Sequence, residues 1–445
     1  MSHPSRAALE RFLSGGTAPG DRAVAQHLLP DCGVCSEVIA SSWATECRAD
    51  DLEVGVGAAS AQDEARYEEV VDRMLGEVRC LEAAVAAERQ EASRLLPRLL
   101  LQPVERQLIL VRNSRQYWTA AVCDLLLEAG FEQRHTDPTA SEALARVAVA
   151  AAARLHSERY GDALVHDVQG RSWAYLANAR RILGDFAGTE QALQTARSLL
   201  AEGTGSPLDE AFCWEVETSL RSTRGDQLGA VRCVGRAIAL YRRIGDRHLL
   251  GRALIQQGMV WGYGQEVARE VILIRTGLRL IDPERDSRVA LAGWHNLCLA
   301  LHRVGENRQA LAALARARPV YVRLGNRAGL LRFQWLEGSI AASLHRDEQA
   351  EGCLREAREG FIQLGVALDA AEVSLDLAAL LCRQSRTAEV LPLAVEMIAI
   401  FESRGTHREA LAAFILLRQA AERERVTEAL LQRLGAFLRE PRAHG

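Results

Sequence analysis

Hydrophobic positions repeat with a period of about 40 residues through the C-terminal two-thirds of this 445-residue chain. Within each period, two stretches place apolar residues three and four positions apart, and short turns separate them, which predicts a pair of amphipathic helices. In residues 291–330, for example, the first helix is expected around Trp294 and Leu297 and the second around Ala310 and Ala317. The period therefore predicts a tandem array of helix pairs that bury their apolar faces by stacking on their neighbours.

Three series of positions keep this register, with successive gaps of 40 or 41 residues. The first series is mostly small and lies on the second helix, where a close helix crossing favours short side chains. The second series falls in the turn between the helices, where Gly supplies the positive φ of a helix C-cap. The third series is largely aromatic and follows the small residue on the second helix. In that order, the series are Ala196, Ala237, Gly277, Ala317, Ala357 and Met397; Gly184, Gly225, Gln265, Gly305, His345 and Ser385; and Tyr241, Ile281, Tyr321, Phe361 and Phe401.

The N-terminal part of the chain lacks this register and divides by composition. Residues 1–46 form a separate small module, and residues 47–62 are rich in Gly, Ala, Ser and Asp and are expected to be a linker. Residues 63–168 have helical periodicity with degenerate repeats and begin with one long helix. The regular array is expected over residues 169–440.

The first regular unit has a bulky residue, a Leu and a small residue on its first helix, then a Gly turn and an Ala on its second helix. These residues are Trp173, Leu176, Ala177, Gly184 and Ala196. In this pattern the chain resembles the tetratricopeptide-repeat (TPR) family. The resemblance implies an all-α fold, namely a right-handed α-solenoid of TPR-like helix pairs preceded by the small N-terminal module. The period exceeds the usual ~34 residues, so longer helices or looser turns are expected.

The TPR resemblance also implies that the first helix of each unit lines a groove that holds a protein or peptide partner. Registering the units by their turns places one stripe of residues on this helix face. Arg and Asn in the stripe suit a carboxylate or a peptide backbone. Exposed side chains of these types are common on helices, so the prediction rests on the stripe as a whole. The predicted protein-binding residues are Arg171, Asn178, Arg181, His295, His302 and Trp335.

Two units depart from the repeat pattern. Glu270 stands where the small residue of the second helix belongs. Ser385 stands at a turn position that is Gly in other units. We therefore expect degenerate units near residues 265 and 385.

Cys and His residues cluster most densely near the N-terminus. Cys32 and Cys35 flank a turn with Gly33, and a Cys-x2-Cys turn can present two thiolates to one tetrahedral ion. His27, five residues before Cys32, is a candidate third ligand, and His3 is a candidate fourth. A module this small gains stability from a bound metal, so we expect a structural Zn²⁺ site. The alternative is that both Cys residues are ordinary thiols beside a surface His.

The order of these elements resembles the zinc-binding anti-sigma-factor fold. That family has an upstream ligand, a short helix ending in a Gly turn, a second helix, and a His followed by Cys-x2-Cys. The resemblance implies zinc binding and contact with a sigma factor or a similar regulator. Two features depart from the family pattern: four residues and not three separate His27 from Cys32, and the upstream ligand is His3 and not a Cys.

Composition and motifs argue against several other classes of protein. The net charge is −4, and residues 50–82 alone contribute −7 (ten acidic residues and three Arg), so direct nucleic-acid binding is not favoured. No apolar run approaches the ~18 residues of a membrane span. Unpaired Cys residues fit a reducing cytoplasm. No phosphate loop, nucleophile elbow or zinc-protease motif is present, so no catalytic residues and no enzyme activity are expected.

The sequence thus favours a cytoplasmic, non-enzymatic regulatory adaptor. Its groove would bind a protein or peptide, and its zinc module would contact a transcription factor such as a sigma factor. The alternative is a self-assembling or multiprotein scaffold in which the finger is only structural. The oligomeric state and the identity of the partner are left open.

Overall fold

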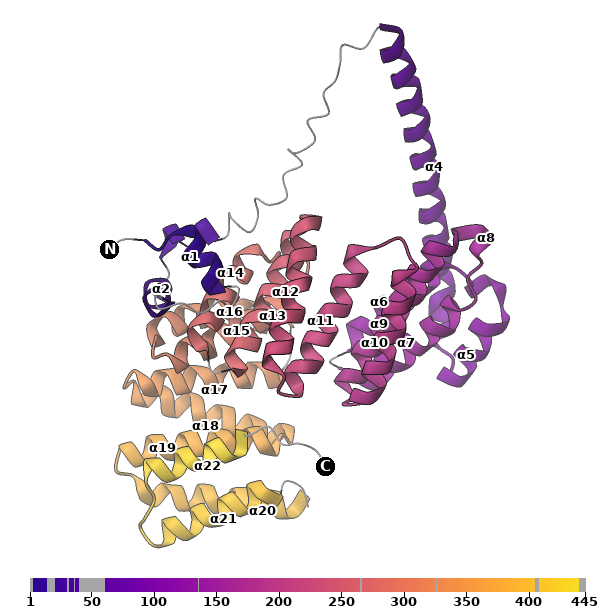
Figure 1. The fold of residues 1–445 in the computed structure, drawn as a ribbon. Helices are drawn as coiled ribbons and strands as arrows, with labels where there is room; N and C mark the ends of the chain where they lie inside the picture. The colour runs from indigo at the N-terminus through magenta and orange to yellow at the C-terminus, as the bar shows by residue number, and fades with distance from the viewer. Residues whose placement is uncertain are drawn as a thin grey trace. The chain divides into compact units, whose positions relative to one another are not determined.

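The computed structural model describes residues 3–13, 21–29, 32–35, 37–39, 61–134, 136–264, 266–324, 327–404 and 408–439. In these ranges every element of regular secondary structure is a helix (Figure 1). The chain divides into two compact units, Met1–Gln265 and Glu266–Gly445. The all-α class expected from the sequence is confirmed. Most of the linker predicted at residues 47–62 lies outside the described residues.

The first unit contains the N-terminal helices α1 (Arg6–Leu13) and α2 (Asp21–Leu28). A long helix, α4 (Ala61–Leu100), follows, as its apolar periodicity predicts. The remaining helices of this unit are α5 (Val104–Asn113), a 3₁₀ turn (Arg115–Tyr117), α6 (Ala120–Gln133), α7 (Pro138–Ala152), α8 (Ser157–Tyr160), α9 (Asp162–Ile182), α10 (Phe186–Ala201), α11 (Pro207–Thr223), α12 (Gln227–Ile244) and α13 (Arg247–Tyr263).

The second unit continues the same succession of paired helices. Consecutive helices such as α17 and α18 pack side by side, and the last helix, α22, packs on α19 (Figure 1). The helices are α14 (Val267–Leu280), α15 (Ser287–Arg303), α16 (Asn307–Leu324), α17 (Arg327–Ser343), α18 (Asp347–Leu364), α19 (Ala367–Arg383), a 3₁₀ turn (Thr387–Glu389), α20 (Val390–Arg404), α21 (Arg408–Glu422) and α22 (Glu428–Arg439).

The turn positions of the register have left-handed backbone, as predicted. Their φ angles are 83° at Gly184, 78° at Gly225, 81° at Gly305, 57° at His345 and 60° at Ser385. After each of them, the next N–H donates to the carbonyl five residues earlier, at 2.8–3.0 Å, which is the hydrogen bond of a Schellman C-cap. Ser385 thus preserves the turn without Gly, at a cost of roughly 1–2 kcal/mol for a left-handed residue with a Cβ. The sixth position of this series, Gln265, lies outside the described residues.

Five positions of the first series, four of them Ala, have no accessible surface. Ala196, Ala237, Ala317, Ala357 and Met397 are all 0% exposed. The largely aromatic series is also buried, with exposed fractions that range from 0% to 7%. The periodic apolar positions of the sequence therefore form a core that repeats along the helix array.

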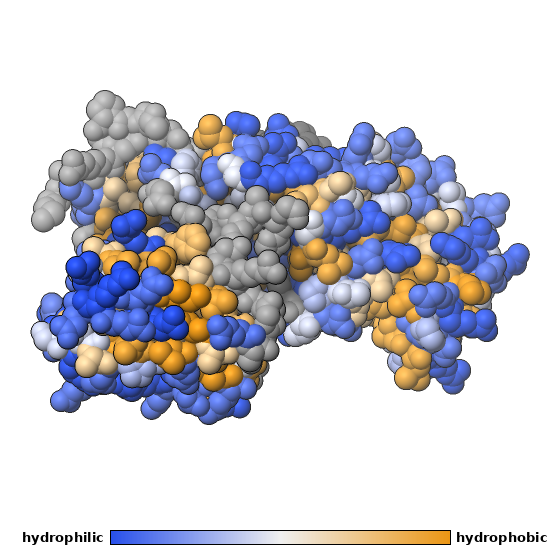
Figure 2. Space-filling view, turned by 90° about the horizontal axis from the view of Figure 1, so that it is seen from below, coloured by the Kyte–Doolittle hydropathy of each residue, from blue (hydrophilic) through white to orange (hydrophobic). Residues whose placement is uncertain are grey.

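Ion pairs connect neighbouring repeats around this core. Arg252 pairs with Glu215 at 2.7 Å, and Arg386 pairs with Glu351 at 2.7 Å. On the face drawn in Figure 2, hydrophilic residues cover much of the described surface, and hydrophobic residues gather in patches between them. Ion pairs contribute little net stability at the surface, and part-buried pairs also lose hydration, so burial of the apolar register holds the helices together. No helix among the described residues is both long enough and apolar enough to cross a bilayer.

Candidate metal centre and candidate binding groove

The four predicted metal ligands come together beside helices α1 and α2. His3 precedes α1, His27 lies in the last turn of α2, and Cys32 and Cys35 lie in the short segment after it. Helices α1 and α2 contact each other and bury apolar side chains such as Leu9. This packing draws residues that are 24–32 positions apart in the chain toward one point.

Four of the six distances between the ligand atoms are close to those of a tetrahedral site. His3 Nδ1 lies 3.2 Å from His27 Nε2, 3.5 Å from Cys32 Sγ and 3.4 Å from Cys35 Sγ. His27 Nε2 lies 3.3 Å from Cys35 Sγ, and all four atoms lie within 4.8 Å of one another. Zinc bonds of about 2.0–2.3 Å to N and S require ligand–ligand separations of roughly 3.3–3.8 Å in a tetrahedron. The residues present therefore fit Zn²⁺ in number, type and spacing.

The surroundings of Cys35 favour its neutral thiol. Burial, followed by the neighbouring Cys32, raises the pKa of the Cys35 thiol above its ordinary value. Two thiols this close disfavour a second negative charge, and a divalent cation reverses that preference by binding both as thiolates. His3 is exposed and Cys35 is buried, so the cluster lies at the edge of the module's core.

A cavity of about 600 Å³ lies on the first helices of successive repeats in the second unit. Helices α15, α17 and α19 supply its wall, and all three residues that the register predicted in this unit line it: His295, His302 and Trp335. Arg332 and Ser339 on α17 occupy the register positions of Arg171 and Asn178, and both also line the cavity. The second-unit part of the predicted stripe therefore lines one cavity.

Several lining residues were not predicted from the sequence. Glu372, Asp376 and Arg383 of α19 line the cavity, and so do Glu428 and Gln432 of α22. The α19 residues lie on the first helix of a repeat, so the register could have found them. Helix α22 follows the last repeat, and only its packing on α19 brings its polar side chains into the groove.

The groove holds its aromatic and imidazole groups in place by hydrogen bonds. Trp335 Nε1 donates to Asp376 Oδ2 at 2.7 Å, and the Ser339 hydroxyl donates to the same oxygen at 3.1 Å. The His295 Nδ1 lies 2.7 Å from the Tyr321 hydroxyl. Burial first, and the charge of Arg332 second, lower the pKa of His295, so its imidazole is neutral at pH 7.

Charged groups of both signs border this groove. Arg332 pairs with Asp369 at 2.8 Å, and an Arg383 guanidinium N–H donates to the Ala342 carbonyl at 3.1 Å. The Glu372 and Glu428 side chains also line the cavity. An extended peptide with polar backbone and mixed charges matches such a wall better than an apolar ligand does.

In the first unit, the predicted stripe residues make contacts within the protein. Arg171 on α9 bonds to Asp124 on α6 and to Asp209 on α11, each at 2.8 Å, and so ties three helices together. An Arg181 guanidinium N–H donates to Asn178 Oδ1 at 3.0 Å. Desolvation by burial lowers the pKa of Arg181. Protein binding by these three residues stays a prediction.

The degenerate unit near residue 265 contains a buried carboxyl. The Glu270 side chain is 6% exposed on α14 and accepts a hydrogen bond from Arg303 on α15. Burial raises the pKa of Glu270 to about 7, against the opposing charge of Arg303. The departure from the repeat pattern thus places an acid inside the helix stack.

This carboxyl should make stability depend on pH. The folded protein keeps the Glu270 proton up to a pH of about 7, whereas an unfolded Glu loses it near about 4.3. The folded state therefore binds more protons in this window, and its stability falls as pH rises. Between pH 5 and 8, wild type should lose about 2–3 kcal/mol of unfolding free energy relative to Glu270→Gln.

Urea denaturation at several pH values measures this difference. Glu359→Gln, which changes an exposed carboxylate on α18, is the control and should follow wild type. Parallel pH profiles for Glu270→Gln and wild type would show that Glu270 titrates normally.

The chain was compared with protein families, curated proteins and solved structures. No family model matches the chain, and no curated protein matches it. A crystal structure of a Rap protein complexed with competence and sporulation factor does match, with a TM-score of 0.51 over 73% of this chain and 88% of that chain, at 13% sequence identity. The fold is a TPR-like α-solenoid.

Two further solved structures match with lower scores. The apo form of RapI has a TM-score of 0.43 at 10% identity and covers 68% of this chain and 98% of that chain. Aspartyl phosphate phosphatase F from Bacillus subtilis has a TM-score of 0.41 at 10% identity and covers 96% of both chains. At these identities the likeness concerns the fold alone.

Proposed function

We propose that this protein is a non-enzymatic regulatory adaptor that binds a peptide segment of a partner protein in the groove of its second unit. The carrying observation is the cavity along α15, α17 and α19, which collects His295, His302 and Trp335 from two repeats. Its neutral imidazole, fixed indole and charges of both signs are groups that recognise peptide backbone and side chains.

The structural comparison supports a ligand in a solenoid of this kind. The Rap protein with the similar fold was crystallised in complex with competence and sporulation factor. By analogy, the groove of this chain would hold a peptide from a regulatory partner. The partner would be bound and released without chemical change.

For the N-terminal module, we propose that Zn²⁺ binds His3, His27, Cys32 and Cys35 and stabilises a surface that contacts a transcription factor of the sigma type. Support comes from the close spacing of the four ligand atoms and from the order of helices and ligands along the chain. The metal would be structural, since four protein ligands fill its coordination sphere. Recovery of a sigma factor on the full-length protein, lost in Cys32→Ser, tests the sigma-type contact.

Blocking the groove tests the adaptor function. Full-length protein with Ser339→Trp on α17 should fill the cavity, whereas Glu348→Trp on the exposed face of α18 leaves it open. Affinity capture from source cells followed by mass spectrometry identifies the partner. Cross-linking then identifies the partner segment that lies in the groove. A synthetic peptide of that segment is titrated into the protein by calorimetry. We expect wild type and Glu348→Trp to bind this peptide and Ser339→Trp to bind it at least about tenfold more weakly. Equal binding by all three proteins would exclude this groove as the site.

A further inference from the structure

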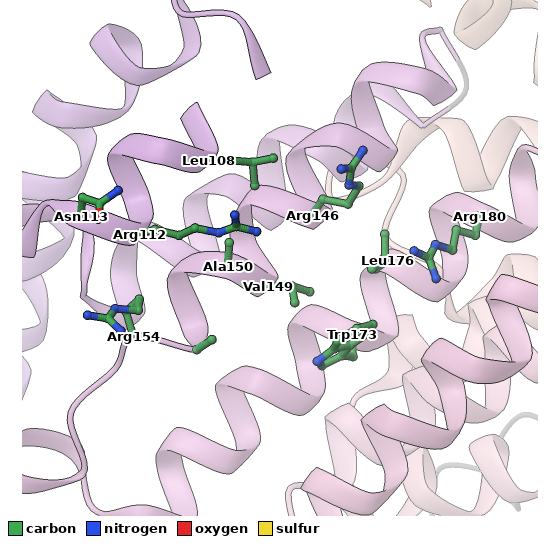
Figure 3. Close-up of a pocket in the computed structure, with 11 residues that line it drawn as sticks. Leu108, Arg112, Asn113, Arg146, Val149, Ala150, Arg154, Trp173, Leu176 and Arg180 are labelled. Atoms are coloured by element: carbon green, nitrogen blue, oxygen red, sulfur yellow. The ribbon is translucent and has the colours of Figure 1, made fainter. Parts of the chain in front are cut away.

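A second cavity, of about 670 Å³, lies in the first unit and is not used by the proposed function. Residues of α5, α7 and α9 line it, and α7 packs against both of the other two helices (Figure 3). On α9 the cavity uses Trp173, Leu176 and Arg180. Arg180 is nine residues from Arg171, which at about 100° per residue places it on the opposite side of the helix from Arg171.

The lining of this cavity is strongly cationic. Four arginines, Arg112, Arg146, Arg154 and Arg180, line it, and no acidic residue does. The nearest paired carboxylate is that of Glu142, whose oxygens lie 3.8 Å from both Arg146 Nη1 and Arg180 Nε. The formal charge of this group of five residues is therefore +3.

Two of the four guanidinium groups have no ion-pair partner within the described ranges. Arg112 is exposed and makes no side-chain hydrogen bond there. Arg154 is also exposed, and its guanidinium stacks over the Trp118 ring at 4.5 Å from the centroid. Both are held on or just after helices that border the cavity, so their charge is available to a ligand.

Between the arginines the cavity has an apolar floor. Val149 and Ala150 of α7 lie three and four residues after Arg146 and so share its helix face. Figure 3 shows them among the arginine side chains, with Leu176 and Trp173 on the neighbouring helix. A ligand that fits this floor needs an apolar group with anionic groups on either side.

We propose that this cavity is a docking site for an acidic peptide segment of a partner protein, in which carboxylates flank an apolar side chain. Guanidinium groups bind carboxylates through paired hydrogen bonds, and the apolar floor receives the central side chain. A nucleic-acid backbone fits less well, because it needs a long track of cations and has no use for the apolar floor. The site is independent of the groove in the second unit.

Fluorescence anisotropy with defined peptides on the full-length protein tests this site. The probe is the labelled peptide Glu-Asp-Glu-Leu-Glu-Asp-Glu, compared with its Gln/Asn analogue, with its Leu→Ser analogue and with a labelled 12-nucleotide oligothymidine. The variant is Arg112→Gln/Arg154→Gln. The matched control, Arg98→Gln/Arg106→Gln, removes two exposed arginines of α4 and α5 that do not line the cavity. Thermal unfolding confirms that both variants fold.

The acidic Leu peptide should bind wild type and the control equally and bind the variant at least about tenfold more weakly. The Gln/Asn and Leu→Ser analogues should both bind more weakly than the parent peptide. Equal losses in the variant and the control would overturn the proposal, because only general charge attraction would remain. Binding of oligothymidine in place of the peptide, or of no probe at all, would overturn it as well.

Discussion

Replacing Cys35 by Ser is expected to abolish stoichiometric zinc binding by the purified protein. The ligand atoms of His3, His27 and Cys35 lie within 3.5 Å of one another. Loss of the buried Cys35 thiol would leave a bound ion with three protein ligands. A structural zinc ion contributes roughly 10–16 kcal/mol of apparent binding free energy in small domains. Losing a ligand should therefore weaken binding by more than the roughly 10–100-fold that loss of a second-shell partner costs. Elemental analysis and competition with a chelator measure both quantities.

Cys80→Ser is the matched control for this experiment. Cys80 is an exposed single cysteine on α4, and its removal should leave one zinc ion per chain. His27→Ala should weaken binding as Cys35→Ser does, since His27 Nε2 belongs to the same cluster. Wild-type protein that holds no zinc at equimolar supply would leave the alternative of ordinary thiols beside a surface His.

The second large effect is expected at Phe361. This side chain is 0% exposed in the core of the second unit and belongs to the largely aromatic series of the register. Phe361→Ala should lower the free energy of unfolding by about 3–5 kcal/mol, because it removes apolar contacts and leaves a cavity that helices can only partly close. Denaturant unfolding followed by circular dichroism measures this loss.

A neighbour on the same helix provides the comparison. Leu364 on α18 is 37% exposed, so Leu364→Ala should cost less than about 1.5 kcal/mol. A small effect of Phe361→Ala, similar to that of Leu364→Ala, would mean that the Phe361 side chain contributes little to the stability of the core. The stacking of repeats around this series would then need another explanation.

The register of the sequence predicted much of the fold because repeats make the same contacts at each period. A turn at Gly305 and a turn at His345 obey the same hydrogen-bond pattern, although only one of them is Gly. For the same reason, His295 and Trp335, one period apart, line one cavity. The His/Cys cluster was predictable for a different reason: His27, Cys32 and Cys35 are potential ligands close together in the sequence, whereas the position of His3 depended on how α1 and α2 pack.

The sequence by itself thus determined the helix pairs, their turns and their buried faces, and it placed His295, His302 and Trp335 on one side of the second unit. Only the tertiary structure decided which charges are available. Arg171 is neutralised by Asp124 and Asp209 from other helices, whereas Arg112 and Arg154 border a cavity that lacks acidic residues. The Arg171 ion pairs join residues that do not occupy matching positions of the 40-residue period, so the periodic pattern could not predict them. Electrostatic pairing depends on distances between side chains of different helices, and those distances exist only once the helices have packed.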